Sequence, residues 1–359
     1  MQLLLFNLKI DCHDKNLAFN LGWAKKLSTK FSVIHLITTE YKAGKLPSNV
    51  NIYSLKKKNN SKKKIILILR FYFYLFKILL NNNSRIKLCF GHMSPLYIVL
   101  SYFFLKILNI PRLLWYTHSQ INFLHRMSFL CSTKVITAGF VNKNFKFNKK
   151  FIHTGHGIDL QNFKNKKKYH TRSYFRLVCI GRLSKIKQIK KIIEAFNLLK
   201  NIKTKKKFKL DIIGSPTNNI ENLYKKELYQ LAKKNKILNL RFLPAVDYRN
   251  VNSKILTYDL LISLSRTNSV DKMILEAMST GIMVLTNNIA FQKVLPKNLK
   301  KYNFLNSASK KKICKKIIQL SDLSLKFKET LSKESINYIE KNHNLDNLIE
   351  KILLFVKKN

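Results

Sequence analysis

Two kinds of segment alternate along this chain. Short runs of β-branched and aromatic residues, typical of buried strands, are followed by longer stretches with helical periodicity. Seven strands are predicted in the first half, at residues 3–7, 31–37, 51–55, 87–90, 113–116, 134–137 and 151–153. Five more are predicted in the second half, at residues 176–180, 209–213, 240–243, 260–264 and 283–286. Strands and helices in this alternation predict an α/β fold with parallel sheets.

The segment at residues 164–172 interrupts the pattern with polar and basic residues, after which the alternation restarts. We expect it to be a polar linker between two α/β halves. A chain of 359 residues supports two domains, because single cores stop growing at about 250–300 residues. The predicted organisation is a first domain at residues 1–165, a second at 172–340 and a C-terminal helix at 341–359.

The chain is strongly basic, with 68 Lys+Arg against 18 Asp+Glu and a formal charge of +50. Such a charge favours an anionic partner: nucleic acid, an anionic membrane surface or a phosphorylated substrate. AT-rich coding also produces abundant Lys and Asn with few Gly and Pro, so part of the excess has a compositional explanation. No Asp or Glu lies between Glu40 and Asp159, which places a function that uses a cationic surface in the first half.

Two apolar stretches, residues 65–80 and 96–110, contain basic residues and fall short of the ~20 apolar residues that a membrane-spanning helix needs. In the first, Lys63, Arg70 and Lys77 recur every seven residues on one face of an apolar helix. This pattern is typical of a helix lying on an anionic bilayer, and equally of a buried helix with one solvated stripe. We expect peripheral binding to the inner face of the cell membrane through these three residues.

The cysteines and the first residues indicate the compartment. Five cysteines are scattered along the chain without a C-x-x-C pair, which argues against a disulfide framework or a zinc site and favours a reducing cytoplasm. The first eleven residues lack the basic lead and apolar length of a signal peptide. We therefore expect a cytoplasmic protein.

The first motif that carries chemistry is Gly181-Arg182-Leu183-Ser184, directly after a predicted strand, with Lys187 at the start of the next helix. Arg offers a planar fork of donors, Lys offers a point charge and the helix N-terminus adds its dipole, a combination that suits a pyrophosphate. The alternative is a pair of solvated basic residues in a basic chain.

The second motif occupies residues 263–286, where a polar loop, a short helix and another strand follow a predicted strand. Glu276 is the only acid on that helix after Asp271. A carboxylate that faces a crevice can accept hydrogen bonds from both hydroxyls of a ribose.

Together these motifs resemble the retaining GT-B glycosyltransferases of the group 1 type. The family pattern G-R-L-S-x-x-K is matched by Gly181, Arg182, Leu183, Ser184 and Lys187. The pattern L-E-A-M-x-x-G is matched by Leu275, Glu276, Ala277, Met278 and Gly281, and the chain also carries Gly155-His156-Gly157-Ile158-Asp159 with Phe163. The resemblance implies two Rossmann-like, doubly wound parallel-sheet domains facing a central cleft. It also implies that the first domain binds the acceptor, that the second domain binds the donor and that the closing helix packs back on the first domain.

The resemblance also implies residue roles. Arg182 and Lys187 would hold the donor diphosphate and act in catalysis, with Gly181 beside them, and Glu276 would bind the donor ribose. The family usually has a second Glu eight residues before Glu276, where this chain has Asn268. The loop is similar to a T-G-S-x-D-K subgroup, so Ser269, Asp271 and Lys272, with Asn268, are expected to contact the sugar.

On the acceptor side the matches are weaker. Members of the family place a His at the end of the strand that corresponds to Thr117-His118, so His118 is expected to act there, with His92 and Asp14 as further candidates. A structural role is the alternative for each histidine. No D-x-D motif occurs, so neither a metal nor any other cofactor is expected beside the donor.

The function that these observations imply is retaining transfer of a hexose from a UDP- or GDP-sugar to a glycan or lipid-linked acceptor, at the cytoplasmic membrane face, in cell-surface polysaccharide or glycolipid biosynthesis. One alternative is a basic nucleic-acid-binding protein. Only the charge supports it, so no nucleic-acid partner is expected. The other alternative is a GT-B-like binding protein without catalysis, which Asn268 leaves open.

Overall fold

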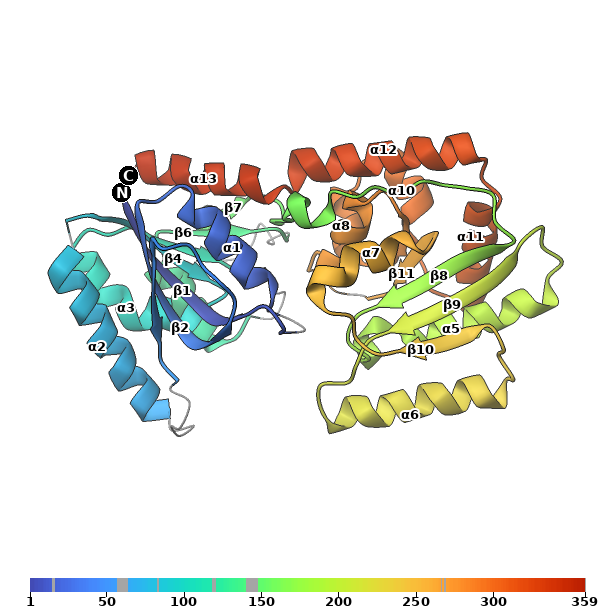
Figure 1. The fold of residues 1–359 in the computed structure, drawn as a ribbon, viewed down its shortest axis with the longest axis horizontal. Coiled ribbons are helices and arrows are strands. Elements are labelled where there is room, and N and C mark those ends of the chain that lie inside the picture. The colour runs from blue at the N-terminus through green and yellow to red at the C-terminus, as the bar shows by residue number, and fades with distance from the viewer. Residues whose placement is uncertain are drawn as a thin grey trace. The chain divides into compact units, whose positions relative to one another are not determined.

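The computed structural model describes residues 1–14, 17–56, 64–82, 84–117, 121–139, 148–265, 267 and 269–358 (Figure 1). The chain forms two compact units. The first unit consists of Met1–Asp159 together with Leu345–Asn359, and the second unit is Leu160–Asn344. Each unit is built around one parallel sheet.

The sheet of the first unit has seven strands in the order β3-β2-β1-β4-β5-β6-β7, and every pair is parallel. The strands are β1 (Gln2–Asp11), β2 (Val33–Ala43), β3 (Val50–Ser54), β4 (Ile86–His92), β5 (Arg112–Trp115), β6 (Lys134–Thr137) and β7 (Phe151–His153). All seven strands predicted for this half are present. Their apolar runs are nearly continuous because helices cover both faces of the sheet.

Five helices cover this sheet on two sides (Figure 1). Side chains of α1 (Phe19–Ser28) and α13 (Leu345–Lys358) share one core with it. Side chains of α2 (Lys64–Asn82), α3 (Pro95–Ile107) and α4 (Phe123–Cys131) form the core on the opposite face. The C-terminal helix α13 therefore belongs to the first unit.

The second unit has a five-stranded parallel sheet in the order β10-β9-β8-β11-β12. Its strands, all of them predicted, are β8 (Tyr174–Ile180), β9 (Lys207–Ile213), β10 (Leu240–Leu243), β11 (Leu260–Ser263) and β12 (Met283–Thr286). Its α-helices are α5 (Ile189–Leu198), α6 (Asn219–Lys234), α7 (Val251–Leu256), α8 (Lys272–Ser279), α9 (Ile289–Val294), α10 (Lys297–Asn303), α11 (Lys310–Ser321) and α12 (Leu325–Asn342). One large core joins α5, α6 and α11 to a single face of the sheet.

Both sheets reverse their strand order at one place. In the first unit β1 lies between β2 and β4, and in the second β8 lies between β9 and β11. Ligands of open α/β sheets bind at such switch points, outside the carboxyl ends of the strands. Asp11 and His92 end β1 and β4, whereas Gly181 follows β8 and the loop to α8 follows β11. The topology thus brings the predicted site residues to the switch point of each sheet.

The carboxyl edge of the second sheet requires a glycine at position 214. A Cβ there would lie 1.9 Å from the carbonyl oxygen of Gly181, which itself has φ +139°. Only a residue without a side chain lets the turn after β8 approach the end of β9 this closely.

The segment at residues 164–172 is not a linker, so that prediction was wrong. Lys167 is buried, and its Nζ lies 3.2 Å from the carbonyl oxygen of Leu256 and 3.1 Å from Oδ1 of Asp259. The hydroxyl of Tyr169 donates to the carbonyl of Gly281 at 3.1 Å. A lysine can bury its aliphatic stem when carbonyls and a carboxylate receive its ammonium. Lys167 and Tyr169 therefore anchor the basic run to the second unit, while the other lysines of the run are exposed.

Helix α2 differs from its prediction in two respects. By length and composition alone it is long and apolar enough to cross a membrane, with 22% of its most apolar window buried. Phe71 and Leu75 nevertheless pack in the core of the first unit. Of the three basic residues expected on a lipid-facing stripe, Lys77 is exposed, and Lys63 lies outside the described residues. Arg70 is half-buried and its Nη1 donates to the carbonyl of Leu55 at 2.8 Å, so it anchors the helix to the protein.

Candidate functional site

The guanidinium of Arg182 stands at the carboxyl end of β8. Its Nε lies 3.1 Å from Oε1 of Glu221, which is buried in the first turn of α6. Glu221 is itself fixed by the backbone N–H and the hydroxyl of Thr217, each at 2.8 Å. The Arg182 side chain is half exposed, and within the described ranges no protein group occupies its two terminal nitrogens. Glu221 therefore aims the guanidinium while leaving its fork available to an anion.

Lys187 follows in a 3₁₀ turn (Lys185–Lys187) and forms an ion pair with Asp271, 84 positions later in the chain. The Nζ–Oδ2 distance is 2.6 Å. Burial alone would lower the pKa of Lys187, but the Asp271 carboxylate outweighs it and raises that pKa above its usual value. Burial would likewise raise the pKa of Asp271, and the Lys187 ammonium holds it below its usual value. Both groups are therefore charged in the folded protein.

Asp271 also organises the loop before α8. As the N-cap residue of α8 it accepts the backbone N–H of Met273 at 3.1 Å, and its second oxygen accepts the hydroxyl of Ser263, the last residue of β11, at 3.0 Å. All of these contacts engage its carboxylate within the protein. The geometry thus assigns Asp271 to positioning Lys187 and the start of α8.

Glu276 lies one helical turn further along α8 and is buried. Its Oε1 accepts the hydroxyl of Tyr248 at 2.9 Å and lies 3.1 Å from Nζ of Lys272. Lys272 in turn donates to the Tyr248 hydroxyl at 3.1 Å. Across the part of the chain that the structure describes, no hydrogen bond or ion pair engages Oε2 of Glu276. The triangle of Lys272, Glu276 and Tyr248 fixes one carboxylate oxygen and leaves the other to accept from a ligand hydroxyl.

The loop between β11 and α8 is held from the next strand. Asn288, directly after β12, donates from Nδ2 to the carbonyl of Ser269 at 2.9 Å and to the hydroxyl of Thr267 at 3.2 Å. Ser269 thus contributes its backbone to the loop's support. Asn268, the position at which this chain departs from the family pattern, lies outside the described residues.

Sequence reasoning missed three residues of this site: Glu221, Tyr248 and Asn288. Each follows the carboxyl end of a strand, β9, β10 and β12 respectively. The sequence shows only that these residues follow predicted strands. It does not show which of their side chains reaches Arg182, Glu276 or the loop.

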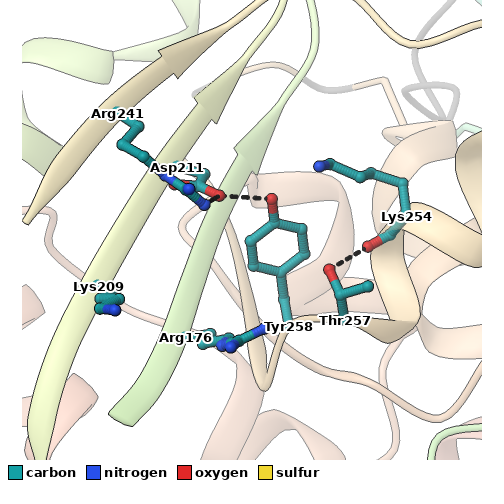
Figure 2. A pocket seen from close by; sticks show the side chains of 7 residues that line it. All are labelled: Arg176, Lys209, Asp211, Arg241, Lys254, Thr257 and Tyr258. Atoms are coloured by element: carbon teal, nitrogen blue, oxygen red, sulfur yellow. Dashed lines mark hydrogen bonds and ion pairs between the residues drawn. The ribbon is translucent and has the colours of Figure 1, made fainter.

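A separate cavity of about 310 Å³ lies in the second unit, between the sheet and α7 (Figure 2). Its lining consists of Arg176, Lys209, Asp211, Arg241, Lys254, Thr257 and Tyr258. None of the predicted donor-site residues lines it.

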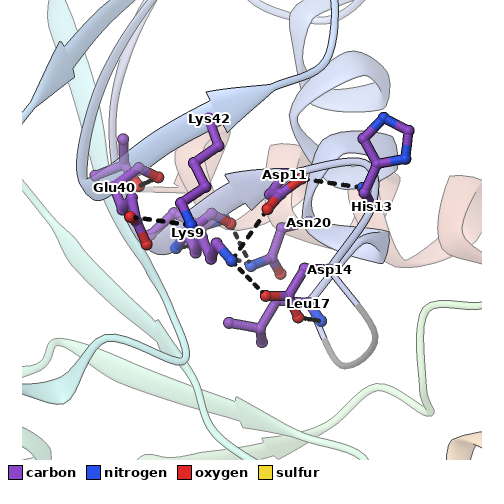
Figure 3. A network of polar contacts seen from close by, with 10 residues as sticks. Lys9, Asp11, His13, Asp14, Leu17, Asn20, Glu40 and Lys42 are labelled. Atoms are coloured by element: carbon purple, nitrogen blue, oxygen red, sulfur yellow. Dashed lines mark hydrogen bonds and ion pairs between the residues drawn. The ribbon is translucent and has the colours of Figure 1, made fainter. Parts of the chain in front are cut away.

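In the first unit, the end of β1 forms a compact polar cluster (Figure 3). Nζ of Lys9 lies 2.6 Å from Asp14 and 3.0 Å from Asp11. Burial alone would lower the pKa of Lys9, but hydrogen bonds to both carboxylates raise it. Asp14 also accepts the backbone N–H of Leu17 at 2.9 Å, so both of its oxygens are engaged. The candidate acceptor-side residue Asp14 therefore binds the Lys9 ammonium and the backbone N–H of Leu17.

The two candidate histidines have different outcomes. His92 is 1% exposed, and its ring stacks on Trp23 with centroids 4.4 Å apart. Its Nδ1 lies 3.5 Å from Nδ2 of Asn7. His92 is the last residue of β4, and its side chain is buried among core side chains. His118 lies outside the described residues.

The carboxylates of the described part of the chain do not assemble into a metal centre. No three His, Cys, Asp or Glu side chains converge there in a way that could hold an ion. On the donor side, Asp271 and Glu276 are each paired with a lysine. Among the described residues of this edge, Arg182 keeps its terminal nitrogens without a protein partner, and the Lys187 and Lys272 ammonium groups lie beside it in their ion pairs.

Comparison with known proteins places the chain in a family. The family model described as "Glycosyl transferases group 1" matches residues 161–342, half of the chain. No curated protein matches. The solved structure of Anabaena Alr3699/HepE in complex with UDP and glucose is similar, with a TM-score of 0.74 at 12% identity over 100% of both chains.

Two further structures share the fold. A glycosyltransferase from Rickettsia africae aligns with a TM-score of 0.75 at 15% identity, covering 99% of this chain and 98% of that one. A sucrose-phosphate synthase from Thermosynechococcus elongatus aligns with a TM-score of 0.75 at 11% identity and the same coverage. At these identities the likeness establishes the fold, here two Rossmann-like parallel-sheet domains of the GT-B class. With the match over residues 161–342, it follows that the chain belongs to the group 1 glycosyltransferases.

Proposed function

We propose that this glycosyltransferase moves a hexose, with retention of configuration, from a UDP- or GDP-sugar to a glycan or lipid-linked acceptor. The reaction would take place at the cytoplasmic face of the membrane, in cell-surface polysaccharide or glycolipid biosynthesis. Two of the similar solved structures support this proposal. Anabaena HepE has been solved with UDP-glucose, and the similar WaaG is described as involved in lipopolysaccharide biosynthesis.

One observation carries the donor assignment. Arg182 and Glu276, which follow β8 and β11 on either side of the switch point, each retain hydrogen-bonding capacity after their protein contacts are counted. A guanidinium fork matches a diphosphate, and a buried carboxylate oxygen matches a ribose hydroxyl. Other protein groups fix both side chains, so neither has to reorganise on binding.

The proposed chemistry is displacement at the anomeric carbon. The bond from that carbon to the diphosphate breaks, the acceptor oxygen bonds to the same face, and the hydroxyl proton leaves with the diphosphate. Negative charge accumulates on the departing diphosphate, and fixed cations stabilise it best where water is excluded. Arg182 and Lys187 would supply this charge without a metal, and Asp271 keeps Lys187 in place beforehand.

An exposed apolar surface on the first unit supports membrane attachment. It is formed by one side of α2 and α3, with Ile65, Leu69, Phe73, Leu80, Phe103 and Ile107 each more than half exposed. Phe104 of α3 packs edge-on against Phe76 of α2, which joins the two helices. Large exposed apolar patches mark interaction sites, and basic residues beside them favour anionic lipid. Residues 41–158 contain no Asp or Glu whose negative charge would repel anionic lipid.

A transfer assay tests the enzymatic proposal. The full chain is incubated with UDP- and GDP-hexoses and a lipid-linked acceptor extract, and products are followed by mass spectrometry, with NMR of the anomeric proton for configuration. Arg182→Ala and Glu276→Gln should each abolish most transfer. The exposed residues Arg85 and Glu329 provide matched controls, because Arg85→Ala and Glu329→Gln remove the same groups elsewhere. Full activity in both site variants would reject the donor assignment.

Flotation with liposomes tests the membrane proposal separately. Leu69→Glu/Phe73→Glu should prevent flotation with vesicles that contain anionic lipid. Ile220 and Leu223, which are similarly exposed on α6, provide the matched pair Ile220→Glu/Leu223→Glu. Flotation that survives the α2 substitutions, or is lost equally in both pairs, would reject this surface.

A further inference from the structure

The cavity of about 310 Å³ in the second unit lies away from the carboxyl edge. Arg176 and Lys209 are each the third residue of their strand, β8 and β9, so four further residues separate Arg176 from the end of β8. At about 3.3 Å per residue this is roughly 13 Å. Leu177 and Leu210, the next residues along, point into the core on the other face, so the cavity opens on the face opposite that core.

The cavity carries an excess of positive charge. Its one carboxylate, Asp211, is 3% exposed and receives two hydrogen bonds from Arg241, at 2.8 and 2.7 Å, and one from the Tyr258 hydroxyl at 2.7 Å (Figure 2). Burial would raise the pKa of Asp211, but these partners hold it below its usual value, so the pair Arg241–Asp211 is neutral as a unit.

Three further cations have no such partner. Within the described residues, no carboxylate pairs with the side chains of Arg176, Lys209 or Lys254, which line the same cavity. Arg176 and Lys209 are directly paired in register on neighbouring strands. Like charges opposite one another in a sheet are unfavourable, so this arrangement favours a bound anion.

Compositional bias accounts poorly for this cluster. The chain contains 58 Lys but only 10 Arg, and two of those ten line this one cavity. Arg241 is oriented by its two hydrogen bonds to the buried carboxylate of Asp211, unlike a lysine on a solvated helix. Arg is also the side chain whose geometry best matches phosphate oxygens.

We propose that this cavity binds a small phosphorylated anion, with Arg176, Lys209 and Lys254 as its cationic contacts and Arg241 oriented by Asp211. The volume lies at the small end of ligand pockets, about 300–1,000 Å³, which favours a small molecule over a polymer. The phosphate belongs either to free inorganic phosphate or to a phosphorylated sugar. This site is independent of the donor site at Arg182.

Calorimetric titration tests the proposal on the full chain carrying Arg182→Ala, which removes the donor-diphosphate contact. The probes are inorganic phosphate, pyrophosphate and glucose 6-phosphate at moderate salt. We expect one bound anion per chain, with its affinity weakened at least about tenfold by Arg176→Gln/Lys209→Gln, since the substitutions remove charge-assisted hydrogen bonds to the anion. The matched control Lys203→Gln/Lys226→Gln removes the same charge from exposed positions of the same unit and should change nothing.

The outcomes separate the alternatives. Tighter binding of glucose 6-phosphate than of phosphate would support an organic ligand, and the reverse would support free phosphate. Equal weakening in both variants, or no binding of any of the three anions, would overturn the proposal. If the cavity variant does not fold, hydrogen exchange on the Arg182→Ala chain decides, because the anion should slow exchange in β8 and β9.

Discussion

Replacing Lys187 by Met would leave the Asp271 carboxylate without its cation. Their Nζ–Oδ2 distance is 2.6 Å, and the two side chains are 23% and 12% exposed. Removing one partner of a buried ion pair costs roughly 3–5 kcal/mol. We expect about 3 kcal/mol, at the lower end of that range, because Lys187 keeps some solvent contact and the Ser263 hydroxyl and Met273 N–H still stabilise the carboxylate.

A double-mutant cycle isolates the pair. Asp271→Asn leaves the Lys187 ammonium without a carboxylate partner, whereas Lys187→Met/Asp271→Asn removes both charges. The double variant should therefore be at least about 2 kcal/mol more stable than the sum of the two single losses predicts. The pH dependence has a definite sign. Because the folded pKa of Asp271 lies below its ordinary 3.8, the pair stabilises the fold above that pH and ceases to do so as the pH falls through the lowered value.

Urea unfolding followed by circular dichroism provides the measurement. Trp23 and Trp115 both lie in the first unit, so tryptophan fluorescence would report on the wrong part of the chain. Acidification from pH 5 to 3 should destabilise the unsubstituted protein more than the double variant. Strictly additive losses in the cycle, with identical acid sensitivity, would refute the inference that Lys187 and Asp271 form a coupled pair.

Three further predictions concern the same edge of the sheet. Gly214→Ala should destabilise the protein by about 3 kcal/mol in thermal unfolding, because the new methyl group would lie 1.9 Å from the Gly181 carbonyl oxygen. A change within experimental error would show that the turn relaxes freely. Tyr248→Phe removes the hydroxyl that donates to Glu276, so the affinity for the nucleotide-sugar donor should fall by about tenfold while the circular dichroism spectrum is unchanged. An unaltered affinity would mean that Lys272 alone holds Glu276. Prolonged EDTA treatment should leave transfer unchanged, whereas activity restored only by added Mg²⁺ or Mn²⁺ would show that the fixed cations are insufficient.

The strands could be predicted from the sequence because parallel strands covered on both faces are apolar almost throughout. β1, for example, has consecutive side chains Leu3, Leu4 and Leu5 that are at most 1% exposed. The motif around Gly181 could be placed at a sheet edge for a related reason, since a strand-to-helix turn has a fixed position relative to its strand. Local pattern therefore gave the order of elements and the edge on which the candidate site lies.

Contacts across the sheet could not be predicted, because they depend on which strand ends become neighbours. Nothing local indicates that Glu221 orients Arg182 or that Asp271 pairs with Lys187 from 84 positions away. The same limit explains the mistaken linker. Lys167 lies in a run of lysines that looks solvated, and only the Leu256 carbonyl at the end of α7 and the carboxylate of Asp259 make its burial favourable.

The proposed function depends on a nucleotide-sugar donor site at the carboxyl edge of the second sheet. Calorimetric titration of UDP and of GDP into the full chain, into Arg182→Ala and into the control Arg85→Ala tests it most directly. We predict that one nucleotide binds, that Arg182→Ala weakens its affinity at least about tenfold and that Arg85→Ala leaves its affinity unchanged. Absence of binding by either nucleotide, or equal binding of both that Arg182→Ala does not alter, would contradict it.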